Sequence, residues 1–345
     1  MKQNIWGKTL PELRALMKEL GAPGYRGQQL FDYMYKRGIL HFDEMAQLPK
    51  ELRNKLIESC IIDFPTIVRE QRSSDRKTAK LLLRYSDDSL IETVLMNQPY
   101  GYSVCISTQV GCAVGCTFCA SGLTGLQRNL TAAEMLAQIY LWQFLYDIKI
   151  HSFVLMGSGE PLQNYDNVLS FMKMCHGFEG LAISYRNMTL STSGITPKIY
   201  DLAKEKIPIT LALSLHAPND TIRNQIMPIS KWYPLPELLE SLQFYIQTTR
   251  RRVTCEYILL AGVNDQPEHA AELAQMIRPL RAHINLIPLN ESSGIPYRRP
   301  EMNHSQEFCE QLQKRGIAAT IRKEMGTEIQ AACGQLKMKF VRDNA

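Results

Sequence analysis

The chain has 345 residues, of which 45% are hydrophobic and 21% are charged. This composition supports one large α/β domain, either alone or with a smaller appendage. The start of the chain is polar, without the apolar run of a signal peptide, and no stretch approaches the length of a membrane span. The nine cysteines follow no disulfide-like spacing. We therefore expect a cytoplasmic protein without membrane contact, in a reducing compartment.

The formal net charge of +5 is mildly basic and is spread along the chain, with short clusters at 250–252 and 298–299. Most basic runs are solvated surface, so these clusters permit nucleic-acid binding without establishing it. Charge alone is a weak indication of an RNA partner.

Residues 8–60 have the pattern of short helices separated by glycine and proline. One helical face carries Leu10, Leu13, Leu16 and Met17, and the pattern breaks at Ala22-Pro23-Gly24. We expect residues 1–60 to form a small helical N-terminal domain.

Two β-prone runs follow, at 79–85 and 90–96, joined by the polar residues 86–89. Two such runs around a polar turn are typical of a hairpin. We expect a β-hairpin extension over 61–98.

From Gly101 onward strands and helices alternate, which predicts a parallel sheet with helical crossovers. The expected strands are 103–107, 152–156, 188–193, 209–215, 252–259 and 283–287, and the expected helices lie near 132–146, 164–175, 197–205, 236–249, 268–277 and 304–315. Six such units are enough for a partial (β/α)6 TIM-like barrel, which we expect over 99–345.

Within these strands, apolar residues alternate with small or polar ones. Val104 and Ile106 oppose Ser103, Cys105 and Ser107; Met188 and Leu190 oppose Thr189, Ser191 and Ser193; Ile209, Leu211, Leu213 and Leu215 oppose Thr210, Ala212, Ser214 and His216. A packed barrel core would use branched aliphatics on both faces, so the polar face indicates a ligand-filled lumen. Hydroxyls bonded to neighbouring backbone would explain one such strand, but less easily three.

A loop in this region carries three cysteines, Cys112, Cys116 and Cys119, spaced C-x3-C-x2-C between flexible glycines. Thiolates are the standard ligands of iron-sulfur clusters, and no fourth cysteine is close enough to complete a zinc knuckle. Three protein ligands on a four-iron cluster leave one iron open to a small molecule. A structural zinc with a distant fourth ligand and simple burial of the thiols are the alternatives.

The second barrel strand ends in Met156-Gly157-Ser158-Gly159-Glu160-Pro161. Glycines at a strand end let backbone approach a ligand, and the glutamate can accept hydrogen bonds from an ammonium group. Such turns are common, so the motif is weak by itself. Its place on the same barrel rim as the cysteine loop strengthens it.

Taken together, the motifs resemble the radical S-adenosylmethionine RNA methyltransferases of the RlmN/Cfr family. The resemblance lies in the cysteine loop and in the runs at 159–161, 191–194, 214–218, 285–288 and 331–336. It extends in the same order over essentially the whole chain, including the N-terminal helices. It implies an α/β partial barrel of the radical S-adenosylmethionine type.

The resemblance also implies roles for individual residues. Cys112, Cys116 and Cys119 would hold a [4Fe-4S] cluster, and S-adenosylmethionine would be contacted by Gly159, Glu160, Ser191, Ser214, Leu215, His216 and Asn290. Cys333 matches the cysteine that becomes methylated, Cys105 the second catalytic thiol, and Glu92 a carboxylate proposed as proton acceptor. From the residues alone, packing explains Cys333 as well as a catalytic role does, packing is favoured for Cys105, and Glu92 would be a solvated strand carboxylate.

The reaction implied by the resemblance is methylation of adenosine C2 in 23S rRNA, at the peptidyl-transferase centre, and in tRNA, 3′ of the anticodon. In that scheme a methylene on Cys333 adds to the base, and Cys105 then attacks the Cys333 sulfur to form a disulfide and release the product. The enzyme would be a monomer, and it would receive electrons from an external one-electron donor such as flavodoxin.

Two features bear on the branch of the family. Pro161 favours the C2 branch over the alternative, the antibiotic-resistance C8 branch, which commonly has alanine there. Ser158 and the run Glu328-Ile329-Gln330 depart from the usual pattern near the site.

Two rival classes remain. An activase that places a glycyl radical on a protein partner would share the cysteine loop, but it would not need Cys105 and Cys333 together. A structural zinc protein that binds RNA without chemistry is the non-enzymatic alternative.

Overall fold

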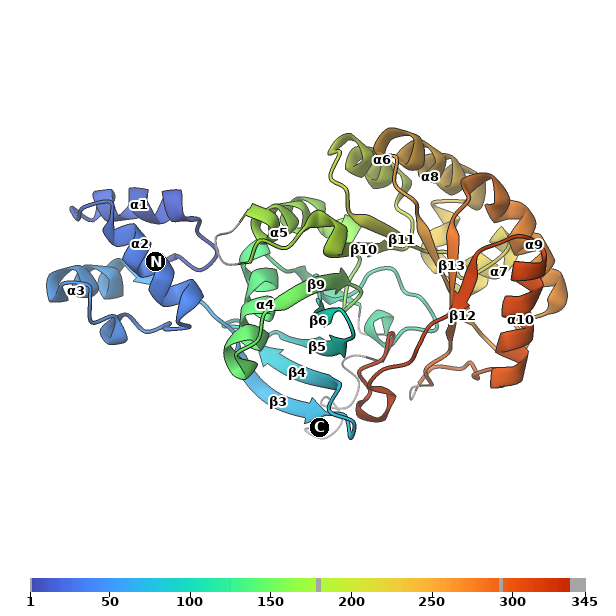
Figure 1. Ribbon diagram of the computed structural model, residues 1–345, viewed down its shortest axis with the longest axis horizontal. Helices are drawn as coiled ribbons and strands as arrows, with labels where there is room; N and C mark the ends of the chain where they lie inside the picture. Colours follow the sequence, from blue (N-terminus) through green and yellow to red (C-terminus); the bar gives the residue numbers. More distant parts are fainter. Residues whose placement is uncertain (1, 124, 178–180, 292–293, 336–345) are drawn as a thin grey trace.

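The computed structural model describes residues 2–123, 125–177, 181–291 and 294–335. Its centre is a ten-stranded mixed sheet in the order β14-β13-β12-β11-β10-β9-β6-β5-β4-β3, which curves around one side of the molecule (Figure 1). The strands from β6 to β14 are parallel, and β3, β4 and β5 are antiparallel to their neighbours. The α/β partial barrel is therefore confirmed.

The parallel strands match the predicted ones closely. They are β6 (Gly101–Cys105), β9 (Ile150–Leu155), β10 (Met188–Thr192), β11 (Thr210–Ser214), β12 (Thr254–Leu259), β13 (His283–Pro288) and β14 (Ala319–Ile321). The short strand β14, which pairs with β13, was not predicted from the sequence.

Helices cover the outer face of the parallel strands (Figure 1). They are α4 (Ala132–Tyr146), α5 (Tyr165–Gly177), α6 (Thr196–Lys204), α8 (Leu235–Thr249), α9 (Pro267–Ile277) and α10 (Met302–Lys314), while the short α7 (Asp220–Ile226) lies at the carboxyl ends of the strands. Helix α4 begins at a capping box, in which the Thr131 hydroxyl accepts from the Glu134 amide and the Glu134 carboxylate accepts from the Thr131 amide. Of these helices, only the short α7 was not predicted.

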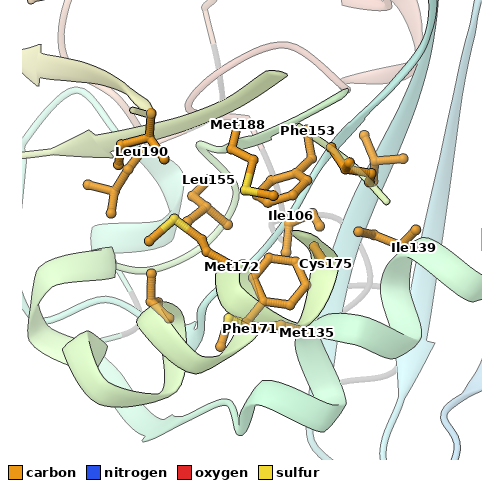
Figure 2. Packing of buried hydrophobic residues seen from close by; sticks show 14 of the residues in the cluster. Ile106, Met135, Ile139, Phe153, Leu155, Phe171, Met172, Cys175, Met188 and Leu190 are labelled. Carbon is orange, nitrogen blue, oxygen red and sulfur yellow. The ribbon is translucent and has the colours of Figure 1, made fainter. Parts of the chain in front are cut away.

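The apolar face of the strands forms the core. Figure 2 shows Phe153 and Leu155 of β9 and Met188 and Leu190 of β10 packing against Phe171, Met172 and Cys175 of α5. These side chains are almost fully buried, and each contributes roughly 1.5–3 kcal/mol of hydrophobic stabilisation. The alternation in the sequence thus separates a helix-covered face from the lumen, as expected.

The predicted hairpin is confirmed as β4 (Thr78–Arg84) and β5 (Leu90–Gln98), joined by a polar turn. A third antiparallel strand, β3 (Thr66–Arg72), completes the group. Because β5 pairs with β6, these strands continue the barrel sheet instead of standing apart from it.

The N-terminal helices are α1 (Leu10–Glu19), α2 (Arg26–Phe31), which continues as one π-helical turn, η1 (Asp32–Lys36), and α3 (Lys50–Ser59). Two short strands, β1 (Gln3–Asn4) and β2 (Cys60–Ile61), pair at the ends of this module. The Trp6 indole donates to the Ala133 carbonyl at 2.9 Å and contacts the ring of Tyr140 on α4. One hydrophobic cluster contains residues of this module and of the barrel. The division of the chain into separate domains at residues 60 and 98 therefore stays a prediction.

No helix within the described residues is long and apolar enough to span a membrane.

Candidate active site

The cysteine loop lies between two short antiparallel strands, β7 (Gln109–Gly111) and β8 (Leu126–Asn129). Gly111 has φ +78°, and a Cβ there would lie 1.8 Å from the Gly125 carbonyl oxygen. Only glycine therefore lets the two strands close the base of the loop. Farther along, the Thr117 amide donates to Ile226 of α7 at 3.0 Å and the Ala120 amide to Gly334 at 2.8 Å.

The first cavity of the candidate site opens between this loop and the carboxyl ends of the parallel strands, the functional end of such barrels. Its polar and sulfur lining is Cys112, Cys116, Cys119, Glu160, Ser191, Thr192, Ser193, Ser214, His216, Glu256, Arg322 and Cys333. Val114, Leu155, Ile258 and Ile287 supply apolar surface. This mixture suits a ligand with both apolar and charged parts.

The donor chemistry of the loop fits an iron-sulfur cluster. Burial raises the pKa of Cys112 to about 12 and also raises those of Cys116 and Cys119, and at Cys116 the neighbouring thiolates add to the effect. A cationic metal group is what deprotonated, buried thiols require. Among the described residues, no three His, Cys, Asp or Glu side chains form a site for a metal ion. A four-iron cluster differs, because each thiolate binds its own iron and the ligands need not converge on one point.

Glu160 joins two strand ends beneath the cavity. Its carboxylate accepts from the Ser193 amide at 2.7 Å and from the Leu162 amide at 3.0 Å, and burial raises its pKa. Next to it, Gly159 has φ +110°, and a Cβ there would lie 2.7 Å from Thr108 and Gln109. The remaining lone pairs of the carboxylate can accept from a ligand.

His216 is buried, and its Nδ1 accepts from the Ile258 amide at 3.0 Å. Burial and the nearby Arg223 charge lower its pKa to about 3, so the ring is neutral near pH 7. Its φ of +59° turns the chain at the end of β11. The preceding residue, Leu215, is fully buried and does not line the cavity with its side chain.

Arg223 of α7 holds these strand ends together, a role that the sequence pattern did not indicate. Its buried guanidinium donates to the carbonyls of Ser193 at 2.6 Å and Leu215 at 3.2 Å. Because α7 itself was not predicted, nothing in the local pattern placed this arginine near the rim.

A second cavity adjoins the first and contains both remaining predicted cysteines. It is lined by Val94, Met96, Cys105, Val154, Met156, Ile287, Pro288, Asn290, Arg322, Glu324, Met325, Ala331, Ala332 and Cys333. Cys333 thus lines both cavities, whereas Cys105 lines only the second. Both thiols are free in this structure, and burial raises the pKa of Cys105 to about 12, with the Cys333 charge adding to it.

Asn290 lies in the second cavity, away from the lining of the first. Its Nδ2 donates to the Cys333 carbonyl at 3.5 Å. Among the described residues its buried Oδ1 has no hydrogen-bond partner, so this oxygen is available to a ligand.

Arg322 follows β14 and lines both cavities. Its pKa is raised above the usual range, first by the Cys333 charge and then by those of Glu256 and Cys105. Arg322 was not predicted as a site residue, because β14, which it follows, was not predicted from the sequence.

Glu92 lies on β5 and lines neither cavity. Its carboxylate pairs with Lys80 at 3.0 Å, and both side chains are almost entirely buried. The alternative prediction, that Glu92 is a solvent-exposed carboxylate on a strand, is therefore wrong.

The departures from the family pattern have identifiable contacts. The Ser158 hydroxyl donates to the Gly111 carbonyl at 3.3 Å, below the cysteine loop. The Glu328 carboxylate accepts from the amide and hydroxyl of Ser74, and the Gln330 carbonyl accepts from Lys80 at 3.1 Å. Leu336, the last residue of the terminal motif, lies outside the described residues.

Known proteins resemble this chain over nearly its whole length. Residues 106–274 match the radical SAM superfamily, and residues 3–62 match the N-terminal domain of ribosomal RNA large subunit methyltransferases. A crystal structure of a radical SAM methyltransferase from Sphaerobacter thermophilus superposes with a TM-score of 0.92 at 43% identity, covering 97% of this chain and 99% of that one.

Two curated relatives carry the same description, probable dual-specificity RNA methyltransferase RlmN. The relative from Symbiobacterium thermophilum is 48% identical over 99% of this chain and 93% of its own length. The relative from Clostridium novyi is 45% identical over 99% of this chain and all of its own length. The chain therefore belongs to the RlmN family of dual-specificity RNA methyltransferases, within the radical SAM superfamily.

Proposed function

We propose that this enzyme methylates C2 of adenosine in 23S rRNA, at the peptidyl-transferase centre, and in tRNA, 3′ of the anticodon. The observation that carries the proposal is the arrangement of Cys333 and Cys105. Cys333 lines both cavities, and Cys105 lines the second together with it. A methyltransferase that moved a methyl group directly to its substrate would need no such pair.

The first cavity is proposed to hold the cofactors, with Cys112, Cys116 and Cys119 on a [4Fe-4S] cluster and S-adenosylmethionine beside it. When bound, these groups supply radical chemistry, which an electron-poor adenine carbon requires because it cannot attack a methyl cation equivalent. Glu160 would accept from the ammonium group, and the hydroxyls of Ser191 and Ser214 would bind polar parts of the nucleoside.

Cys333 is proposed to carry the one-carbon unit, because this residue lines both the first cavity, proposed for the cofactors, and the second. The Cys105 thiolate would then attack the Cys333 sulfur. A sulfur–sulfur bond forms and the sulfur–carbon bond breaks. Its electron pair stays with the product carbon, which takes up a proton to complete the methyl group. A thiol reductant must afterwards return the disulfide to two thiols.

Glu92 is proposed to accept the proton that the base loses. Cys105 is opposite Val94 on β5, and Glu92 is two residues from Val94 along the same strand. Glu92 therefore lies on the same face of the sheet as Cys105, where it pairs with Lys80. We further propose a cytoplasmic monomer that receives electrons from a donor such as flavodoxin.

Mass spectrometry of rRNA and tRNA nucleosides tests this function. A strain lacking its own enzyme is complemented with this gene or with its Cys333→Ala variant. We expect 2-methyladenosine in both RNA classes with the native gene and none with the variant. Recovery of 8-methyladenosine would instead assign the chain to the C8 branch, and unmodified RNA in both strains would contradict the proposal.

A further inference from the structure

Lys80 of β4 is a buried lysine that has no place in the chemistry described above. Only 5% of its surface is exposed, and a buried charge persists only when it is paired. Its Nζ lies 3.0 Å from Oε1 of Glu92 and donates to the Gln330 carbonyl at 3.1 Å. One ammonium group therefore joins two segments that are far apart in the sequence.

The sheet register aligns Lys80 with the catalytic thiol. Lys80 is opposite Val94 on β5, and Val94 is opposite Cys105 on β6. Directly opposed residues of antiparallel strands share a face. Lys80, Val94 and Cys105 thus form one row across three strands, and Glu92 lies on the same face of β5.

Gln330, the other partner of Lys80, lies three residues before Cys333. It adopts a left-handed backbone with φ +53°, and the next amide, of Ala331, donates to the Gly326 carbonyl at 2.9 Å. This compact turn presents the Gln330 carbonyl to the lysine. The Lys80 contact is therefore close to the base of the loop that carries Cys333.

The same loop has a second attachment to the antiparallel strands. Glu328 accepts from the amide and hydroxyl of Ser74, in the turn between β3 and β4. In Figure 1 the red segment after the last barrel strands runs beside the free ends of β3 and β4. The Cys333 loop is thus docked on the antiparallel strands, with Lys80 at the buried end of the docking surface.

We propose that Lys80 is a positioning residue that ties the Cys333 loop and the Glu92 carboxylate to one another. Loop docking places the Gln330 carbonyl on the ammonium, and the same ammonium fixes the carboxylate beside the row that contains Cys105. The proposal rests on the roles assigned above to Cys333 and Glu92. A purely structural ion pair would serve stability alone, and apolar residues of similar volume often do that as well or better.

The loop half of the proposal is tested by hydrogen exchange on the whole protein, read from a peptide that contains residues 326–335. Lys80→Met removes the polar contacts to Glu92 and to the Gln330 carbonyl, and it keeps most of the aliphatic part of the side chain. We expect about tenfold faster exchange, the ratio for losing one hydrogen bond from a charged donor. Glu92→Gln leaves the Gln330 contact and should change exchange far less. Lys77→Met, at an exposed lysine on the approach to the same strand, is the matched control.

The catalytic half is tested by the amount of RNA covalently bound to the enzyme in cells. Lys80→Met and Glu92→Gln should each accumulate the adduct, because both impair proton loss, and the double variant should accumulate no more than the stronger single variant. Lys80→Arg, which keeps a positive charge and N–H donors, should keep exchange slow and adduct low, and it guards against a general folding defect of Lys80→Met.

Unchanged exchange in Lys80→Met would overturn the loop half, and an additive double variant would overturn the link to Glu92. Failure of the proposed function itself is distinguishable, because the Cys105→Ala variant would then hold no adduct either. In that case the exchange measurement still decides whether Lys80 docks the loop.

Discussion

The parallel and antiparallel parts of the sheet contribute to the site in different ways. The parallel strands supply it through the loops after their carboxyl ends, where Glu160, Ser193 and His216 line the first cavity. The antiparallel strands supply Lys80 and Glu92 from within β4 and β5, and they dock the Cys333 loop. The proposed cofactor contacts are thus concentrated at strand ends, whereas the residues proposed for thiol and proton chemistry lie across strand faces.

The largest expected effect is at the cysteine loop, where the cluster is proposed to bind. Cys116→Ser should remove one ligand of the cluster and reduce RNA methylation below detection, because the cofactors supply the chemistry. Iron and sulfide analysis after anaerobic purification measures the loss, with Cys60→Ser as the control cysteine outside the site. Stoichiometric zinc and no iron in the native protein would contradict the cluster.

The next effect concerns the core behind the parallel strands. Phe171 of α5 is fully buried against Phe153, and Phe171→Ala should lower the free energy of unfolding by about 3–5 kcal/mol. Urea denaturation measures it. The exposed Phe244→Ala is the matched control, with a smaller expected loss. A loss below about 1 kcal/mol for Phe171→Ala would show that α5 does not seal this face.

The smallest expected effects are on how stability depends on pH, and they differ in sign between the first cavity and the antiparallel strands. Burial raises the pKa of Glu256, lining the first cavity, despite the opposing Arg322 charge and Asn285 hydrogen bond. The unfolded chain therefore loses the Glu256 proton at a lower pH than the folded protein does. Stability falls as pH rises from about 4.3, the unfolded pKa, through the folded pKa. Glu256→Gln should remove that fall, because the amide does not titrate in this range. Urea unfolding between pH 4 and pH 8 measures it, and an unchanged slope would contradict the assignment.

Asp87, in the turn between β4 and β5, should behave in the opposite sense. Hydrogen bonds from Arg128 lower its pKa to about 2, so its contribution is present above about pH 4 and is lost as pH falls toward 2. Asp87 is half-exposed, so Asp87→Asn should cost below about 1 kcal/mol. Acid unfolding midpoints of the two proteins measure it, and greater acid resistance of the variant would contradict the sign.

The sequence predicts the barrel well because alternation over five or more residues is a strong signal, as in β11, where Leu211 and Leu213 face the helices. It misses β14 because three residues carry too little pattern. It also misses that β5 pairs with β6, since pairing is not local.

The same limit applies to the site. The cysteine loop and the Gly159-Glu160 turn were identified because their residues are adjacent in the chain. Lys80 and Arg322 were not, since their roles come from contacts with segments far away in sequence. Asn290, which the resemblance matches to the cofactor, lines the second cavity, and its cofactor contact stays a prediction.

Cys333 is proposed to carry the one-carbon unit, and Cys105 is proposed to release the product by attacking the Cys333 sulfur. Cys105→Ala should trap RNA on the enzyme, because the thiolate attack on the Cys333 sulfur cannot occur. Cys333→Ala should trap nothing, and Cys309→Ala, at a buried helix thiol, should behave as the native enzyme. A denaturing gel with and without ribonuclease should show a slower, nuclease-sensitive band for Cys105→Ala alone. An adduct in Cys333→Ala, or the same behaviour in both variants, would contradict the assignment.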